Sequence, residues 1–302
     1  MPLRLPAAIV LGCGLLVACG ITLHPLPPGP RPTEVWDTAE RPPRAVILAL
    51  HGFNDYRHAF AGFAGYAAAR GYHVEAFDQQ GFGGNANRGL WPGRAALVED
   101  IVARLTELRQ SLPDTPLLLL GESMGAAAAV VAVENGAPPI DGLILISPAI
   151  WDDASVSGLY RVVLDLAAGI APGWTVTGRG LGIRASDNDE ALIALGRDPM
   201  VIKETRLDAI AGLVQLMDEA WQAAGVLKLP VLILMGEHDE VIAPESMRNF
   251  TARVDPAYCH AVAYAEGWHL LLRDLEAEKV WRDILTWIES GESAWPCPAV
   301  VR

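Results

Sequence analysis

A serine set between two glycines is the first feature of this sequence that could do chemistry. The pentapeptide Gly121-Glu122-Ser123-Met124-Gly125 follows the apolar run 117–120 and precedes an alanine-rich stretch. G-x-S-x-G between a strand and a helix is typical of a sharp turn that holds a serine hydroxyl above the edge of a sheet. The glycines let the chain turn and let neighbouring elements approach closely. The pattern therefore predicts Ser123 as a nucleophile.

A serine hydroxyl is a weak nucleophile and needs a general base, which in turn needs an orienting acid. Asp239 ends the segment VLILMGEHD, and His269 ends the segment AVAYAEGWH. Both segments begin as apolar runs, so both side chains are expected just beyond strand ends. Glu237 and Glu240 lie close enough in sequence to serve as the acid instead, and His269 could be a structural histidine of the core.

Short apolar runs and helical patterns alternate along the chain and would position these residues. Short, continuous apolar runs that end at Gly, Asp or Ser fit strands covered on both faces. Strands that alternate with helices predict an α/β fold with a mostly parallel, doubly wound sheet. In such sheets chemistry collects at the carboxyl ends of the strands. The predicted strands are 45–50, 73–77, 117–120, 143–146, 231–235 and 261–264, and the predicted helices are 94–112, 124–134 and 275–289.

One interval breaks the alternation. Residues 151–225 contain no strand-like run but several helical patterns, including 159–170 and 202–224. This interval predicts a helical cap over a core formed by residues 44–150 and 226–302.

With these residues in view, the chain resembles the α/β-hydrolase superfamily and, within it, the group of monoacylglycerol lipases, lysophospholipases and serine aminopeptidases. The resemblance covers roughly residues 44–291, cap included. The chain order Ser123, Asp239, His269 is that of the superfamily's catalytic triad. One turn departs from the pattern, because Gln80 stands where arginine is usual, which puts a local salt link in doubt. Further motifs that carry the resemblance are the His51-Gly52 turn, the turn 78–83, the motif D-x-V-I-x-P at 239–244, and Arg197-Asp198-Pro199 in the cap.

The resemblance implies an α/β-hydrolase fold with a cap inserted before the acid-bearing strand, and it favours Asp239 as the acid. It assigns the oxyanion hole to the backbone N–H groups of Phe53 and Met124. His51 is then expected to support its turn and not to act as a base. The implied chemistry is acyl transfer in two steps, through an acyl-enzyme on Ser123.

The implied activity is that of a serine hydrolase that cleaves carboxylic esters. The expected partner is a monoacyl lipid, either a lysophospholipid or a monoacylglycerol.

In the cap, Val163 and Leu166 either line a channel for the acyl chain or simply pack on the sheet. Two alternatives stay open. One is a non-catalytic lipoprotein that uses the fold for binding. The other is an aminopeptidase of the same fold, which would hold a substrate ammonium with cap carboxylates such as Asp187, Asp189, Glu190 and Glu204.

The composition excludes several classes of protein. The 302 residues include 36 acidic and 23 basic side chains, a net charge of −13, which argues against nucleic acid as a partner and against charge-driven binding to anionic lipid. A hydrophobic share of 51% excludes a disordered chain. Neither a cofactor nor a metal is predicted, because the sequence has no G-x-x-x-x-G-K-[ST], H-E-x-x-H or paired C-x-x-C motif.

The N-terminus carries a separate pattern. Residues 1–18 combine Arg4 with an apolar stretch, which describes an export signal better than a membrane span. The sequence Leu16-Val17-Ala18-Cys19 resembles the lipobox of bacterial lipoproteins, which implies cleavage before Cys19 and acylation of that residue; an uncleaved anchor helix is the alternative. In such lipoproteins an aspartate directly after the acylated cysteine often retains the protein at the inner membrane, but here that residue is Gly20. We therefore expect a lipid-anchored protein of the bacterial cell envelope, at the outer membrane and facing the periplasm.

The segment 19–43 is predicted to be a tether behind the acylation site. Five prolines lie between Pro25 and Pro32, and proline-rich chain forms extended, semi-rigid spacers. Loss of residues 1–18 removes Arg4 and leaves 22 basic against 36 acidic side chains, a net charge of −14, so acyl chains and not charge are expected to hold the membrane. Cys259 and Cys297 either pair in an oxidising periplasm or remain two thiols.

Overall fold

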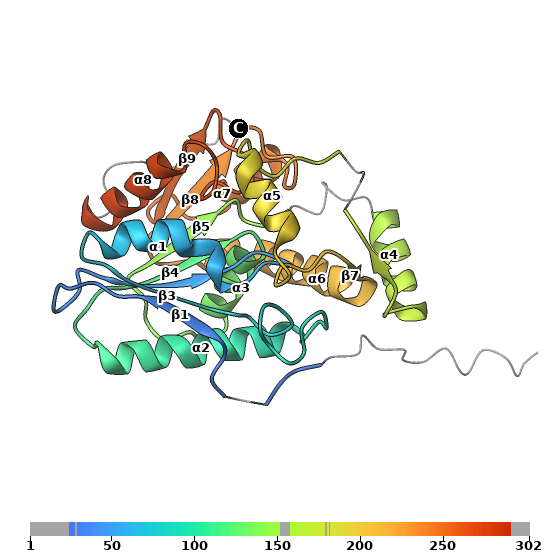
Figure 1. The fold of residues 1–302 in the computed structure, drawn as a ribbon, viewed down its shortest axis with the longest axis horizontal. Coiled ribbons are helices and arrows are strands. Elements are labelled where there is room, and N and C mark those ends of the chain that lie inside the picture. Colours follow the sequence, from blue (N-terminus) through green and yellow to red (C-terminus); the bar gives the residue numbers. More distant parts are fainter. Residues whose placement is uncertain (1–23, 28, 152–157, 179, 181, 291–302) are drawn as a thin grey trace, which may run out of the picture.

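The computed structural model describes residues 24–27, 29–151, 158–178, 180 and 182–290 (Figure 1). Within these residues a seven-stranded sheet runs in the order β1-β3-β2-β4-β5-β8-β9. Each neighbouring pair is parallel except β1 with β3. The predicted fold class is therefore confirmed. The strands are β1 (Thr33–Trp36), β2 (Val46–Leu50), β3 (His73–Phe77), β4 (Leu117–Glu122), β5 (Gly142–Ile146), β8 (Val231–Gly236) and β9 (Cys259–Tyr264).

Helices cover both faces of this sheet (Figure 1). Two helices and the inward side chains of the strands form one apolar core on one face, and four helices form the other. The alanine- and valine-rich helix α3 is the most deeply buried, because its small side chains let it lie close to the strands. The first face carries α1 (Ala61–Ala68) and α8 (Ala277–Ser290), and the second carries α2 (Arg94–Ser111), α3 (Met124–Glu134), α6 (Leu207–Ala223) and α7 (Pro244–Thr251).

The interval between β5 and β8, for which the name cap is kept below, is mostly helical but also contains extended chain. It holds α4 (Gly158–Ile170), α5 (Asp189–Arg197) and the helix α6. The expectation that it lacks strands is wrong, because β6 (Thr175–Val176) pairs antiparallel with β7 (Thr205–Arg206). Two residues per strand are too few to give a periodic signal in the sequence. Helix α6 packs on α3 and belongs to the main apolar core, so this part of the interval is continuous with the body of the protein.

The second half of the predicted tether is part of the fold, so the prediction of a spacer up to residue 43 is wrong there. Strand β1 pairs with β3 at the edge of the sheet. Just before it, the guanidinium of Arg31 donates to both carboxylate oxygens of Asp100 on α2, at 2.7 and 3.0 Å. A four-residue edge strand that follows a run of prolines has too short a pattern to be recognised from sequence.

Several sequence-based expectations fall outside the described residues, namely the signal 1–18, the acylation site Cys19 and the thiol of Cys297. Cys259, at the start of β9, is disulfide-bonded. In the described part of the chain, no helix has both the length and the apolar character needed to cross a bilayer.

The tight packing of α3 against β2 gives a first prediction. A methyl group at Gly125 would lie 2.0 Å from the carbonyl oxygen of Leu50, which is backbone and has no room to yield. We expect Gly125→Ala to lower the free energy of unfolding by about 3 kcal/mol, measured by denaturant titration.

Gly65 is the matched control for this substitution. It lies inside helix α1, and no atom lies within 4 Å of the position that its methyl group would take. Gly65→Ala is expected to leave stability unchanged or to raise it by about 0.5–1 kcal/mol. Equal unfolding midpoints for Gly125→Ala and the wild type would contradict the packing argument.

Candidate active site

Ser123 occupies the turn between β4 and α3 in a backbone conformation that side chains rarely adopt. Its φ is 54° and its ψ is −116°. The turn is held by backbone bonds, since the N–H of Ser123 donates to the carbonyl of Ile146 at 2.9 Å. A methyl group at Gly121 would lie 2.4 Å from the carbonyl oxygen of Gly125, so both glycines are needed for so tight a turn. The geometry matches the turn predicted from G-x-S-x-G.

The side chains of Ser123, His269 and Asp239 form one chain of hydrogen bonds. The Ser123 hydroxyl donates to Nε2 of His269 at 3.0 Å, and Nδ1 of His269 donates to Oδ2 of Asp239 at 2.8 Å. The other carboxylate oxygen of Asp239 accepts from the N–H groups of Val241 and Ile242, both at 2.8 Å. These two bonds orient the carboxylate toward the imidazole. The arrangement can deprotonate a serine hydroxyl and hold the resulting imidazolium.

The two glutamates that flank Asp239 point elsewhere. Glu237 pairs with Arg248 on α7. Glu240 accepts from the backbone N–H of Arg184 at 2.6 Å. The structure therefore brings Asp239, and neither of its neighbours, to His269.

His51 is buried and supports the turn after β2, as expected. Its Nε2 accepts from the backbone N–H of Gln79 at 3.0 Å, which leaves Nδ1 to donate to the carbonyl of Gly52 at 2.8 Å. Burial lowers the pKa of His51, in keeping with a neutral ring. With both ring nitrogens engaged by backbone, His51 has no free nitrogen to serve as a base.

The segments that carry the two residues expected to form an oxyanion hole are both close to Ser123. Gly52, just before Phe53, approaches so closely that a methyl group on it would be 3.4 Å from the β-carbon of Ser123. Met124 is the first residue of α3, a position whose N–H has no partner inside the helix and lies at the positive end of the helix dipole. The structure thus brings both segments to the nucleophile.

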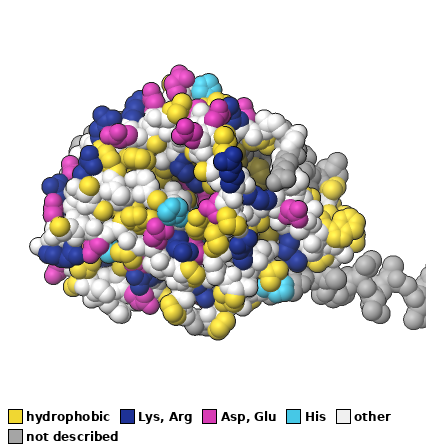
Figure 2. Space-filling view, in the orientation of Figure 1, with side chains coloured by type: hydrophobic (Ala, Val, Ile, Leu, Met, Phe, Trp, Pro, Cys, Tyr) yellow, Lys and Arg dark blue, Asp and Glu magenta, His cyan; other side chains and the backbone are white. Residues whose placement is uncertain are grey.

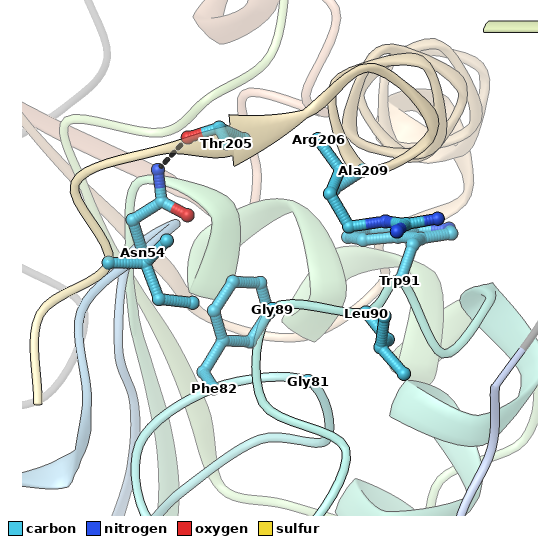
Figure 3. A pocket seen from close by; sticks show the side chains of 10 residues that line it. Asn54, Gly81, Phe82, Gly89, Leu90, Trp91, Thr205, Arg206 and Ala209 are labelled. Carbon is cyan, nitrogen blue, oxygen red and sulfur yellow. Dashed lines mark hydrogen bonds between the residues drawn. The ribbon is translucent and has the colours of Figure 1, made fainter. Parts of the chain in front are cut away.

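An aromatic cluster lies beside Phe53. The Phe53 ring meets Phe82 edge-on with centroids 5.5 Å apart, and Trp91 at 6.4 Å. Phe82 and Trp91 also line a small pocket between the loop after β3, the loop after β2 and the segment before α6 (Figure 3). Phe53 thus packs against two of the residues that line this pocket.

The cap segment before α6 binds directly to the loop after β2. The side chain of Asn54 donates to the hydroxyl of Thr205 at 2.7 Å (Figure 3), and its carbonyl accepts from the N–H of Ile202 at 2.9 Å. Tyr56 donates to Asp198 at 2.7 Å. Asn54 has a φ of 66°, which these bonds help to maintain. Sequence reasoning missed this link, since a polar pair about 150 residues apart leaves no local pattern.

A second cap segment binds the loop that carries His269. The N–H of Leu270 donates to the carbonyl of Ala185 at 2.9 Å, and Ser186 donates to Asp274 at 2.6 Å. Asp187 accepts from the N–H of Leu275 at 2.8 Å. The cap is thus fastened to the loop after β2 and to the loop that carries His269.

The turn 78–83 is held without the arginine that the resemblance expects. Asp78 accepts from the backbone N–H groups of Arg57 and Gly84, at 2.9 and 2.7 Å, and pairs with the Arg57 guanidinium. Gln80 has no salt link; its side-chain oxygen instead accepts from the N–H of Leu26 at 2.6 Å. The substitution thus binds the N-terminal segment to this turn.

The apolar cap residues singled out from the sequence lie on the surface. Val163 and Leu166 are 55% and 58% exposed on the outer face of α4, while Leu164 and Ala168 on the opposite face pack against α6. The structure therefore does not enclose Val163 and Leu166 in a channel. It also does not pack them on the sheet.

No group of three or more His, Cys, Asp or Glu side chains is placed to hold a metal ion in the part of the chain that the structure describes.

The profile of a family described as "serine aminopeptidase, S33" matches residues 41–276. The chain belongs to this family. The resemblance to the α/β-hydrolases and to its lipase and peptidase group is thereby confirmed.

Individual relatives agree with this assignment. The chain is 26% identical over 260 residues to the monoacylglycerol lipase of Mycolicibacterium smegmatis, covering 85% of this chain and 92% of that protein. It is 26% identical over 259 residues to a phospholipase of Bacillus subtilis, covering 82% and 96%. Among solved structures, a monoglyceride lipase from Saccharomyces cerevisiae in complex with a substrate analogue has a TM-score of 0.74 at 18% identity, covering 87% of this chain and 92% of that one.

The orientation of His269 by Asp239 gives a prediction that separates Asp239 from the neighbouring carboxylate of Glu240. Asp239→Asn keeps the shape of the side chain but favours the wrong imidazole tautomer, so turnover of an activated ester should fall about 10⁴-fold. Glu240→Gln, which can still accept from Arg184, should stay within about two-fold of the wild type. A larger loss for Glu240→Gln than for Asp239→Asn would show that the triad has been assigned wrongly.

Proposed function

We propose that this protein is a serine hydrolase that cleaves the carboxylic ester of a monoacyl lipid, either a lysophospholipid or a monoacylglycerol. The single observation that carries the proposal is the hydrogen-bonded chain from Ser123 through His269 to Asp239. It starts at a strained serine next to the backbone donors at positions 53 and 124, which is the arrangement that acyl transfer requires.

The reaction follows from this geometry. His269 Nε2 takes the hydroxyl proton as Oγ of Ser123 attacks the ester carbonyl, and Asp239 stays ionised and stabilises the imidazolium. The N–H groups of Phe53 and Met124 donate to the oxyanion, and loss of one such donor typically costs about 10²–10³ in turnover. The imidazolium proton then passes to the leaving alcohol, which departs and leaves an acyl-enzyme. Water attacks the acyl-enzyme by the same route, releasing the fatty acid and restoring Ser123.

Two observations support a lipid as the acyl donor. The relatives in Mycolicibacterium and Bacillus are named as a monoacylglycerol lipase and a phospholipase. In addition, apolar side chains gather over α4 at the right edge of the molecule in Figure 2. Val163 and Leu166 belong to this exposed apolar surface, over which a lipid substrate would reach the enzyme. The exposed apolar residues of this face are Val162, Val163, Leu166, Ile170 and Trp174.

An aminopeptidase of the same fold is the alternative, and its requirement is a carboxylate free to bind an ammonium group. Asp187 already accepts from the N–H of Leu275, and Asp189 pairs with Arg184 at 2.8 Å. Glu190 and Glu204 are exposed on the surface of the cap. Two of the four carboxylates are thus committed to holding the cap, which favours the ester hydrolase.

Acylation at Cys19 would hold the protein at the bacterial outer membrane, facing the periplasm. The N–H of His24 donates to the carbonyl of Trp91 at 3.3 Å, so the described chain begins beside the aromatic cluster of the site. Five residues span at most about 18 Å, which keeps the lipid anchor close to this edge of the molecule. The net charge of −14 that remains after cleavage supports an acyl anchor over electrostatic attraction to anionic lipid.

A panel of soluble esters, monoacylglycerols, lysophospholipids and a peptide amide tests the proposed reaction, with Ser123→Ala as the blank. We expect hydrolysis of the esters, with higher kcat/KM for long acyl chains, and no turnover of the amide. Ser123→Ala should lose about 10⁶-fold in turnover. Amide turnover without ester turnover would support the aminopeptidase instead, and failure of a fluorophosphonate to label Ser123 would reject a serine hydrolase.

The same panel tests the cap residues. Val163→Asn and Leu166→Asn change exposed positions and should leave short-chain esters unaffected while lowering kcat/KM for long-chain esters by about ten-fold each. Val226→Asn is the matched control, because Val226 is equally exposed at 56% but lies outside α4. Equal effects of all three variants at every chain length would remove Val163 and Leu166 from the substrate path.

Membrane attachment is tested separately through Cys19. In a bacterial host supplied with an alkyne-tagged fatty acid, we expect the full chain to be labelled and to sediment with membranes. Cys19→Ser should abolish the label, since no other residue is expected to carry it. A membrane-bound, unlabelled wild type of full-length mass would favour the uncleaved anchor helix over acylation.

A further inference from the structure

The guanidinium of Arg273, which is largely shielded from solvent, lies between two carboxylates. One of its guanidinium nitrogens, Nη1, donates to Asp55 at 2.7 Å, and the other, Nη2, donates to Glu122 at 2.9 Å. The side chains of Arg273, Asp55 and Glu122 are 16%, 10% and 1% exposed. One cation thus joins two anions that belong to different parts of the chain.

Each of the three residues is next to a different part of the site. Glu122 directly precedes Ser123, and Asp55 follows Phe53 by two positions. Arg273 follows His269 by four positions in the same loop. A single guanidinium therefore bridges the segments that carry the nucleophile, one oxyanion donor and the base.

Stability alone does not explain this cluster. Burial raises the pKa of Glu122, which reflects the cost of holding its charge away from water. Nε of Arg273 and Oε1 of Glu122 are buried without a hydrogen-bond partner among the described residues. When apolar residues of similar volume replace buried ion pairs of this kind, the protein is often at least as stable as before. The charges are therefore better explained by the geometry that they impose.

A guanidinium is suited to impose that geometry because its N–H groups form a rigid planar fork. The loop is also fixed on its other side, where Asp274 accepts from the N–H of Trp268 at 2.8 Å and from Ser186. The carbonyl of Arg273 accepts from the side chain of Asn188 at 2.9 Å. His269 thus lies between two fixed points, and movement of either would shift its ring.

We propose that Arg273 is a positioning residue of the hydrolase, whose simultaneous bonds to Asp55 and Glu122 set the distances between Ser123, His269 and the N–H of Phe53. The inference rests on the proposed ester hydrolysis. It goes beyond it by assigning a role to a residue that contacts neither the substrate nor the reacting atoms.

Three variants test the role. Arg273→Met removes the bridge and leaves two buried carboxylates unpaired. Arg273→Lys keeps the charge and most of the volume but cannot reach both carboxylates with a fixed fork. The triple variant Asp55→Asn, Glu122→Gln, Arg273→Met removes all three charges together, so it has no unpaired ion. Arg282→Met, an exposed arginine of α8, is the control.

The measurements are kcat and KM for a soluble butyrate ester, the rate constant of fluorophosphonate labelling, and the unfolding midpoint. We expect Arg273→Met to lower kcat and the labelling rate about 100-fold, because a displacement of catalytic groups by about 1 Å costs about that much in rate. KM should change by less than about three-fold. Arg273→Lys should recover about ten-fold of this loss. The triple variant should regain stability but not kcat, and Arg282→Met should match the wild type.

A purely structural role gives a different result, in which the triple variant regains both stability and kcat, and this would overturn the inference. Arg273→Lys decides the question even where the other variants fail to fold, since a kcat within about two-fold of the wild type would also overturn it. A wild type that neither hydrolyses the ester nor reacts with the fluorophosphonate would instead reject the proposed function itself.

Discussion

The left-handed backbone of Ser123 is the constraint around which the site is built. A non-glycine residue in such a conformation costs about 1–3 kcal/mol and persists only where surrounding contacts maintain it. Here the N–H of Ser123 donates to the carbonyl of Ile146, and its own carbonyl accepts from Ala149, so the turn is tied to the end of β5. The same turn presses α3 against β2 at Gly125, where no side chain fits. The hydroxyl that results is fixed above the sheet before any substrate arrives.

The cap holds two loops of the active site in place through hydrogen bonds. It binds the loop after β2 through Asn54 and Thr205, and the loop after β9 through Ser186 and Asp274. These loops carry the expected oxyanion donor and the base. A ligand that rearranged the cap would therefore also move the loops that carry the base and the expected oxyanion donor. The hydrogen bonds of Asn54 and Ser186 thus connect substrate binding with the positions of the reacting groups.

Apolar and charged side chains are unevenly divided between the interior and the surface of the protein. The apolar surplus of the sequence lies mainly in the two cores of the sheet, but part of it is exposed on the outer face of α4. Among the charges of the site, Glu122 is only 1% exposed and pairs with Arg273, which is 16% exposed. Glu122 is the second residue of the G-x-S-x-G motif and the last residue of an otherwise apolar strand. A carboxylate there requires a buried partner, which is the one signal by which the sequence could have pointed to this pair.

Local features of the sequence were sufficient for the sheet and for the nucleophile. Continuous apolar runs mark strands buried on both faces, because a parallel sheet covered by helices leaves no polar face. The glycines around Ser123 mark the turn, because only they allow its close contacts. Both kinds of information lie within a few neighbouring residues.

Apart from the family resemblance, which favoured Asp239, the residues themselves left three carboxylates open as the acid, and the tertiary structure decided which of them meets His269. It brought Asp239 to His269 while Glu237 turned to Arg248 and Glu240 to the cap, a choice between carboxylates of equal chemistry that depends on direction in space. It also placed β1 in the sheet, despite the prolines before it, and put the outer residues of α4 on the surface. Each of these outcomes depends on contacts between segments far apart in the chain. Such contacts cannot be predicted from the local sequence pattern of either segment, because their free energy depends on both segments together.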